Sequence, residues 1–341
     1  MEPFITLTAD ARVRLCDEAQ ARIGLPAASI EKDFWVCWTL RELFREREWG
    51  QHLVFKGDTS LSKAWKLIER FSEDIDIVID RTFLGFGGAE SPERGASRKM
   101  KERRLEGLKA ACQDRIRNSL LPALASQFSA SLGNETGWKL EADETDIDQQ
   151  SLLFSYPSSV ARAAYVRPVV KIELGARSDA EPIETPDIQP YLAEVFPDIL
   201  GPSSFPIRAV AARRTFWEKA MLLHEETYRP AGRARKPRLA RHYYDLWSLI
   251  RKGIGEQAIE DVGLFERVAA HRQVFFRWSW MDYSTLSRGR LRLVPPDDQV
   301  REWRQDYRTM QAEMIFGEAP TFDELLRVVG DFETRFNGTA A

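Results

Sequence analysis

The chain has 341 residues, 43% of them hydrophobic, which is enough to bury a sizeable core in two domains. Its formal net charge of −3 excludes an overall attraction to nucleic acid, although the segments 94–117 and 208–241 are locally basic. The three cysteines are widely spaced, which excludes a disulfide framework or a Cys/His metal site. With no signal segment and no apolar run of about 18 residues, we expect a soluble, cytoplasmic protein without a membrane partner.

Residues 7–48 are predicted to be mostly helical. Leu15, Ala19 and Ile23 recur at helical spacing, and a second helix is expected from Ser29 onward. This segment should form a helical layer ahead of the first strand.

Residues 53–80 predict a strand, a glycine turn, a helix and a second strand. The apolar run at 53–55 leads into Lys56 and Gly57, where glycine can adopt a positive φ. The helix is expected to begin at Thr59 or Ser60 and to end near Phe71. Such a layout is typical of nucleotidyltransferases.

From Ser72 the pattern changes to alternating isoleucines and acids, which predicts a strand with one acidic face. Asp74 and Asp76 are two apart and therefore point the same way. Paired carboxylates can hold Mg²⁺ or Mn²⁺ against the phosphates of an NTP. Acids on the solvent face of an antiparallel strand are a common alternative, but the glycine turn with adjacent hydroxyls favours the catalytic interpretation.

The middle of the chain predicts a flexible loop at 85–97, a long amphipathic helix at 98–132, and strands between 137 and 177. In the last strand, Glu173 is the acid best placed to be a third metal ligand, and a surface pair with Lys171 is the equally weighted alternative. A proline-punctuated linker follows. We therefore expect a first domain at 1–205 and a helical domain at 206–341.

Two helices of the second part carry further candidates. Lys219 lies in an apolar helix, where it is either an active-site cation or a surface lysine paired with Glu218 or Glu225. Asp245 lies among aromatic and apolar residues, so a buried carboxylate with a cationic partner is expected there.

Between these helices, the basic loop 229–241 could grip an RNA backbone, with solvated charge as the alternative. The aromatic run at 275–283 could stack on exposed bases, although a buried cluster is the more common outcome.

The sequence resembles the AbiEii/AbiGii-type nucleotidyltransferase toxins of the DNA polymerase β-like superfamily. The resemblance covers about two-thirds of the chain, and it rests on five segments in order: IEKDFWV (30–36), KGDTSLSKAW (56–65), RFSEDIDIVID (70–80), TFWEKAMLL (215–223) and RHYYDLWSL (241–249). One position departs from the family, which usually has a second glycine where this chain has Asp58. The extra carboxylate is expected to alter phosphate affinity or nucleotide choice.

The resemblance implies an α/β fold, with a polymerase β-like domain on a small mixed sheet, a helical C-terminal domain, and the active site in the cleft between them. It favours Asp74, Asp76, Lys219 and Asp245 as catalytic residues, and Asp74, Asp76 and Glu173 as metal ligands. The expected nucleotide-binding residues are Lys56, Gly57, Thr59, Ser60, Ser72 and Arg214.

By the same resemblance, the acceptor is a tRNA 3′ end, translation is arrested, and a separately encoded antitoxin is the partner. Two alternatives stay open: transfer to a protein or small-molecule hydroxyl, and a nucleotide-binding regulator without turnover.

Overall fold

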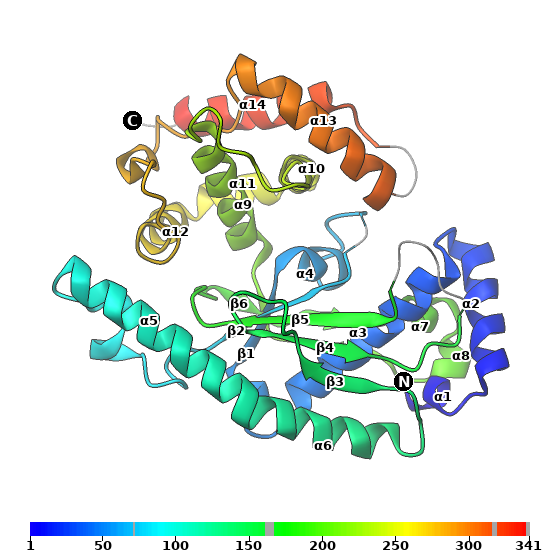
Figure 1. The fold of residues 1–341 in the computed structure, drawn as a ribbon. Helices are drawn as coiled ribbons and strands as arrows, with labels where there is room; N and C mark the ends of the chain where they lie inside the picture. Colours follow the sequence, from blue (N-terminus) through cyan, green and yellow to red (C-terminus); the bar gives the residue numbers. More distant parts are fainter. Residues whose placement is uncertain (71, 161–166, 316–318, 339–341) are drawn as a thin grey trace. The chain divides into compact units, whose positions relative to one another are not determined.

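The computed structural model describes residues 1–70, 72–160, 167–315 and 319–338. The chain forms two compact units (Figure 1). The first comprises Met1–Ala64 and Glu73–Ala209, and the second comprises Trp65–Ser72 and Val210–Ala341.

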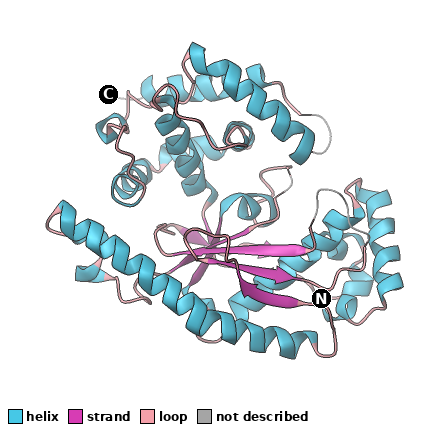
Figure 2. Cartoon of the chain, in the orientation of Figure 1, coloured by secondary structure: helices cyan, strands magenta, loops and turns pink. Residues whose placement is uncertain are grey.

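A mixed sheet forms the centre of the first unit (magenta in Figure 2). Within the residues described it has seven strands, in the order β3-β4-β5-β2-β1-β9-β6. The strands are β1 (Leu53–Lys56), β2 (Ile75–Ile79), β3 (Lys139–Ala142), β4 (Ser151–Ser155), β5 (Val169–Gly175), β6 (Ile183–Glu184) and β9 (Ala209–Val210). Strand β2 pairs antiparallel with β1 and parallel with β5. The acidic strand is therefore an inner strand of the sheet, and the expected α/β class with a mixed sheet is confirmed.

The helices of the first unit surround this sheet. They are α1 (Glu2–Ile5), α2 (Ala9–Ile23), α3 (Ala27–Arg45), α4 (Gly57–Lys63), α5 (Arg98–Arg115), α6 (Leu121–Leu132), α7 (Tyr191–Val195) and α8 (Pro197–Leu200). Helix α3 contacts β5, and α6 contacts β3. The predicted helix at 98–132 is present as α5 and α6, joined by a π-helical turn at Ile116–Leu120.

Aromatic side chains join the helices of the first unit to its sheet. The ring of Trp38 on α3 lies 4.7 Å from Phe128 on α6 and 5.4 Å from Phe154 on β4, measured between centroids. All three rings are buried. Such contacts contribute beyond the buried area alone, so they fix α3 and α6 on the sheet.

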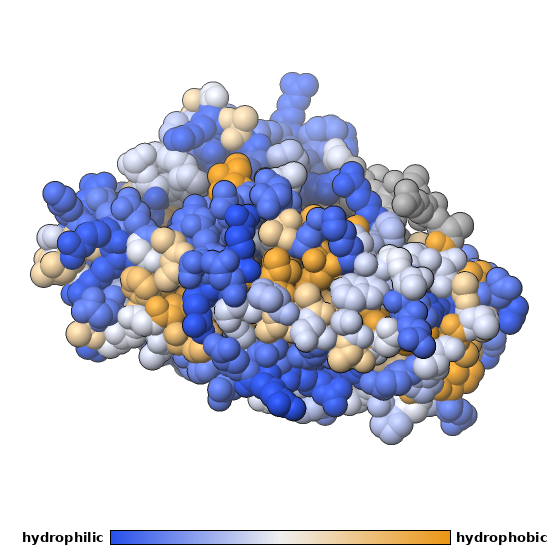
Figure 3. Space-filling view, turned by 60° about the horizontal axis from the view of Figure 1, so that its bottom comes forward, coloured by the Kyte–Doolittle hydropathy of each residue, from blue (hydrophilic) through white to orange (hydrophobic). Residues whose placement is uncertain are grey.

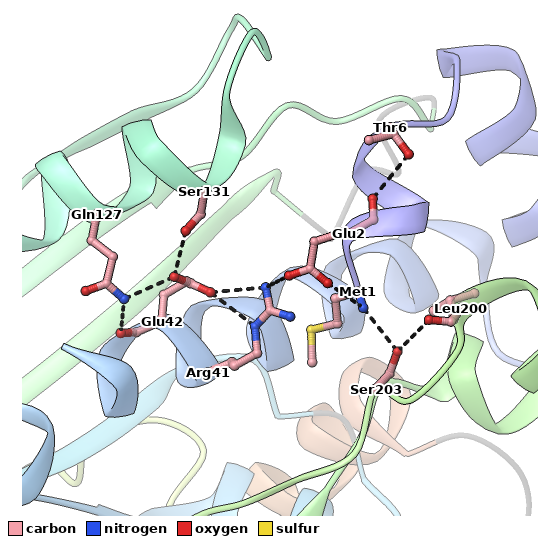
Figure 4. Close-up of polar contacts among 9 residues, drawn as sticks. All are labelled: Met1, Glu2, Thr6, Arg41, Glu42, Gln127, Ser131, Leu200 and Ser203. Atoms are coloured by element: carbon pink, nitrogen blue, oxygen red, sulfur yellow. Dashed lines mark hydrogen bonds and ion pairs between the residues drawn. The ribbon is translucent and has the colours of Figure 1, made fainter. Parts of the chain in front are cut away.

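A polar network lies near the C-terminal end of α3 (Figure 4). The carboxylate of Glu42 accepts hydrogen bonds from Gln127 at 3.0 Å and Ser131 at 2.9 Å on α6. The neighbouring Arg41 pairs with Glu2 at 2.9 Å, and the amino group of Met1 donates to Ser203 Oγ at 3.2 Å. The network ties the start of the chain to helices far along the sequence.

The second unit is helical. It contains α9 (Ala212–Thr227), α10 (Arg241–Arg251), α11 (Ile254–Glu260), α12 (Val262–Phe275), α13 (Asp297–Met314) and α14 (Phe322–Gly338). Its core centres on Trp217 of α9, whose ring lies 4.9 Å from both Phe265 on α12 and Phe336 on α14. Helix α9, which carries Lys219, is therefore packed on several sides.

Two expectations about connecting segments were wrong. The helix expected from Thr59 to about Phe71 ends at Lys63, and Phe71 itself lies outside the described residues. The chain turns away because the carbonyls of Lys66 and Leu67 accept hydrogen bonds from Lys252 and Ser248 of the second unit, which includes residues 65–72.

The proline-rich stretch expected to be a linker instead belongs to the first unit. It contributes α7, α8, β6 and the two-stranded sheet of β7 (Asp187–Ile188) and β8 (Phe205–Pro206). The glycine-rich segment at 85–97 contains two short 3-10 helices, Gly88–Glu90 and Pro92–Arg94.

The three cysteines are buried and free, as the sequence indicated. Within the described ranges, none of the helices has both the length and the apolar character needed to cross a bilayer. The face drawn in Figure 3 is largely hydrophilic, with hydrophobic residues in small patches.

Candidate active site

Three acidic side chains gather on the central strands of the first unit. Asp76 on β2 is in register with Glu173 on β5 and with Lys56 on β1. Paired positions on neighbouring strands share a face of the sheet, so these three side chains form a row across it. Asp74 lies two residues earlier, on the same face as Asp76. We call Asp74, Asp76 and Glu173 the carboxylate cluster.

Burial and mutual repulsion raise the pKa of both aspartates. Burial is the main cause for Asp76, whose pKa is raised to about 7, and the charges of Glu173, Asp58 and Asp74 act in the same direction, whereas Lys56 opposes them. The pKa of Asp74 is raised to about 6 by partial desolvation and then by Glu173 and Glu73. Asp74 stays exposed, so water screens part of this effect. The cluster carries more negative charge than its surroundings neutralise.

This excess negative charge fits a divalent cation. Hard cations such as Mg²⁺ prefer carboxylate oxygens, and Mg²⁺ commonly takes only one or two from the protein and the rest from water and phosphates. Among the described residues, no three His, Cys, Asp or Glu side chains stand close enough to form a metal centre by themselves. Asp74 and Asp76, with Glu173 beside them, are therefore the residues that could hold part of a metal's coordination shell.

Glu173 lies between a positively charged neighbour, Lys171, and a negatively charged one, Asp76. Lys171 Nζ lies 2.7 Å from its Oε1, which is the surface pair considered from the sequence. Its position beside Asp76 also makes it a neighbour of the metal-binding candidates. Because 43% of its side chain is exposed, Glu173 can exchange partners at little cost.

Gly57 is required by the close approach of Asp76. Its φ is +77°, and a Cβ atom at this position would lie 2.1 Å from Asp76 Oδ2. Only glycine tolerates both conditions. The turn predicted from the sequence therefore brings the backbone at the start of α4 against the carboxylate.

The two hydroxyl residues that follow are buried. Thr59 is fully buried, and its Oγ1 donates a hydrogen bond to the carbonyl oxygen of Asp74 at 2.5 Å. Ser60 is 1% exposed. In this structure Thr59 thus fixes the start of β2, while Lys56 Nζ donates to Ser178 Oγ at 2.9 Å.

The sequence reasoning missed the part that α3 plays here. Three consecutive residues of α3 are buried and each has a polar partner: Lys32 pairs with Glu73, Asp33 with Lys63, and Glu31 with the 158–159 loop. Lys32 thereby holds the residue just before Asp74, and Asp33 holds the end of α4. Charged residues placed consecutively in an otherwise apolar helix were the available signal, because buried charges need partners.

A second cluster lies within the second unit and centres on Asp245, which is fully buried. Arg70 donates to both carboxylate oxygens, at 2.7 and 2.8 Å, and Lys219 Nζ lies 2.8 Å from Oδ2. Lys219 also lies 3.4 Å from His242 Nδ1. We call these residues the lysine–aspartate cluster. The expectation that Asp245 has a cationic partner is confirmed, and Arg70 is a second partner that was not singled out.

Both oxygens of Asp245 already accept charge-assisted hydrogen bonds. The carboxylate is therefore arranged to hold Lys219 and Arg70 in place. Lys219 and Arg70 thus meet at one carboxylate, and two cations held close together suit an anionic ligand. Arg214, one helical turn before Glu218, is buried and donates to that side chain at 3.1 Å, whereas Ser72 is half-buried.

The basic loop 229–241 is partly neutralised within its own unit. Arg229 and Arg235 both pair with Glu226, and Arg235 also pairs with Glu302 and lies over the ring of Trp303 at 4.6 Å. The aromatic run is divided: Phe275 is buried, whereas 41% of Trp278 is exposed.

Comparison with known proteins decides the family. A protein-family model described as "Nucleotidyl transferase AbiEii toxin, Type IV TA system" matches residues 38–328. The chain belongs to this toxin family. The resemblance drawn from the five sequence segments is thus confirmed. An AbiEii toxin is a nucleotidyltransferase, which implies an NTP substrate, and a toxin of a type IV system implies an antitoxin counterpart.

Two solved structures are similar to this AbiEii toxin. JHP933 from Helicobacter pylori is 13% identical over 90% of each chain, with a TM-score of 0.41. MenT4, a nucleotidyltransferase toxin from Mycobacterium tuberculosis H37Rv, is 17% identical over 97% of this chain and 88% of its own, with a TM-score of 0.40. No curated protein matches the sequence.

Proposed function

We propose that this AbiEii toxin transfers a nucleoside monophosphate from an NTP to the 3′-terminal hydroxyl of a tRNA, releasing pyrophosphate and thereby blocking translation. The observation that carries the proposal is the carboxylate cluster packed against Gly57, because paired acids beside a glycine turn are what a metal-bound triphosphate needs. The family membership supports the reaction class.

In this proposal Asp74 and Asp76 hold Mg²⁺ or Mn²⁺, with Glu173 as a further ligand. The bound cation would neutralise the phosphates and polarise the reacting phosphorus. The protein's own part is to hold the two acids in position, and the pairing of β2 with β5 and the Thr59 hydrogen bond to the carbonyl of Asp74 do this.

The nucleotide is proposed to contact the α4 turn. Gly57 exposes its backbone to close approach, and Lys56 supplies a positive charge beside it. Thr59 and Ser60 were expected to bind the phosphates; because both are buried, we propose instead that they shape the turn. Asp58 adds a negative charge at this place and raises the pKa of Asp76, so it sets a requirement for the cation. Ser72 and Arg214 remain proposed nucleotide-binding positions.

Lys219 is proposed as the cation that stabilises charge on the departing pyrophosphate, and Asp245 as the residue that positions it. The 2.8 Å contact between them supports this division of roles. A buried carboxylate bonded to two cations is suited to orientation rather than to proton removal from an attacking hydroxyl.

The test is transfer of label from each of four α-³²P NTPs to total RNA, to purified tRNA and to total protein, with and without Mg²⁺. Label on the tRNA 3′ end that is lost with Asp76→Asn supports the proposal. Label on protein or on a small molecule instead moves the acceptor to a different hydroxyl. Bound NTP with no labelled product in any arm would overturn the transfer mechanism.

A further inference from the structure

A stacked pair of tryptophans lies in the second unit, between α12 and the 3-10 turn at Tyr283–Thr285, with Trp278 exposed and Trp280 half-buried. Trp278 and Trp280 stack with their ring centroids 4.4 Å apart and their planes inclined at 27°. Five large apolar side chains are exposed in the described part of the chain, and Trp278, at 41%, is the aromatic one among them. We call Trp278 and Trp280 the tryptophan platform.

The platform is held in place by its own segment. The backbone N–H of Trp278 donates to the hydroxyl of Tyr283 at 3.0 Å, and that hydroxyl donates to the carbonyl of Phe276 at 2.9 Å. A hollow of about 270 Å³ lies along the same segment and is lined by Arg277, Tyr283 and Ser284, among others. The exposed ring is thus part of a defined surface rather than a free loop end.

Two guanidinium groups border Trp280. The guanidinium of Arg233 lies 4.4 Å from the centroid of Trp280, and that of Arg229 lies 5.4 Å away. Arg229 is neutralised by Glu226, but Arg233 and Arg277 form no ion pair within the described residues. The nearest acid on the segment, Asp282, has its two oxygens engaged by Ser284.

We propose that the tryptophan platform, with Arg233 and Arg277, binds unpaired nucleotides of a single-stranded RNA. An exposed indole face offers stacking to any base, and adjacent unpaired arginines offer contacts to the phosphates between bases. A protein partner would favour a continuous apolar patch, whereas here the aromatic face is bordered by cations. The choice of RNA rather than DNA rests on the proposed tRNA acceptor. The surface deepens that function because it would bind nucleotides of the acceptor RNA that are distant from the reacting hydroxyl.

Binding is measured on the full-length protein without NTP, by fluorescence anisotropy of a labelled 12-nucleotide single-stranded RNA. Trp278→Ala is expected to weaken binding about tenfold, because one stacked base is lost, and Trp278→Phe to restore most of it. Arg233→Ala is expected to weaken binding and to reduce its salt dependence by about one unit of slope. The matched control is Arg251→Ala, since Arg251 also lies over a tryptophan, Trp247 at 5.4 Å, but pairs with Glu324.

Heparin serves as a polyanion without bases. Trp278→Ala should leave heparin binding unchanged, while Arg233→Ala should weaken it. Thermal unfolding of each variant shows whether the second unit is intact, and Trp278→Phe keeps the test decisive if the alanine variant is unstable.

RNA affinity unchanged in Trp278→Ala, or equal losses for RNA and heparin, would overturn the inference. So would a change in oligomeric state of Trp278→Ala without RNA, because a second copy of the chain would then be the occupant. A wild-type protein that binds RNA through Trp278 yet transfers no nucleotide supports this surface and contradicts the proposed function, so the two failures are distinguishable.

Discussion

Among single residues, Asp76 lies in surroundings that disfavour its charge. Its pKa is raised from 3.8 to about 7, so the folded state disfavours the carboxylate. An acid whose folded pKa is raised destabilises the fold increasingly as pH rises from about 4 to 7, and below that window its effect disappears. The ionised Asp76 therefore lowers the free energy of unfolding, and a bound cation would offset this loss.

We predict opposite effects of Asp76→Asn on stability and activity. In EDTA at pH 7.5, the variant should unfold at a higher temperature than the wild type, and this advantage should vanish near pH 4. Transfer should fall about a thousandfold, because a metal-ligating charge is lost. Asp80→Asn, at the exposed end of the same strand, is the control and should change neither property. A transfer rate near wild type for Asp76→Asn would remove Asp76 from the active site.

Lys219 and Asp245 should act as one unit. Because the two side chains are in direct contact, Lys219→Ala and Asp245→Ala should each reduce transfer strongly, and the double variant should lose much less than the sum. The measurement is kcat/KM for the four corners of the cycle. Additive losses would show that the two residues work independently.

Arg70 is expected to contribute mainly to the stability of the lysine–aspartate cluster. Arg70→Ala removes a bidentate partner from a buried carboxylate and should lower the free energy of unfolding by about 3 kcal/mol. Lys252→Ala, which removes two exposed contacts to the same segment, with Glu69 and with the carbonyl of Lys66, should cost less than about 1 kcal/mol. Urea unfolding followed by far-UV circular dichroism measures both.

At the scale of elements, the α4 turn depends on the absence of a side chain at Gly57. Gly57→Ala should cost the left-handed backbone strain of about 1 kcal/mol and, in addition, push Asp76 from its position, so that transfer is lost. Gly85→Ala is the matched control, since Gly85 has a φ of +87° but no atom within 4 Å of an added Cβ. Equal effects of the two substitutions on transfer would show that contact with Asp76 does not matter.

The elements that could be predicted are those whose reasons lie in neighbouring residues. The strand at 75–79 follows from the alternation of isoleucine with acid, and the turn at Gly57 from glycine after an apolar run. The early end of α4 could not be predicted, because its cause lies in Ser248 and Lys252, far along the chain. For the same reason the sequence predicted a cationic partner for Asp245 but did not single out Arg70.

At the scale of the whole molecule, stability should depend on pH through His224. This side chain is buried, its Nδ1 accepts the backbone N–H of Arg292 at 2.9 Å, and its Nε2 lies 3.0 Å from Thr285 Oγ1. Burial, and then the charges of Arg292, Arg272 and Arg290, lower its pKa to about 4 from 6.5. The folded state therefore holds a neutral imidazole.

Between pH 6.5 and 4 the unfolded chain takes up a proton at His224 and the folded chain does not, so stability falls as pH falls and levels off below about 4. We expect a loss of about 3 kcal/mol from this group. His224→Asn keeps an acceptor for the backbone N–H of Arg292. The free energy of unfolding of this variant minus that of the wild type should rise as pH falls from 6.5 to 4. A difference that is flat with pH would show that His224 is not responsible.

The pairing of Arg70 with Asp245 also has a consequence in time. The two residues are 175 positions apart, so at about 5–20 residues per second a ribosome adds Asp245 roughly 9–35 s after Arg70. Until then the segment that precedes β2 lacks its anchoring carboxylate, and Lys219 lacks its partner. The lysine–aspartate cluster therefore cannot form on the nascent chain until Asp245 has been added. Under the proposed function, the nascent toxin cannot transfer a nucleotide before that point.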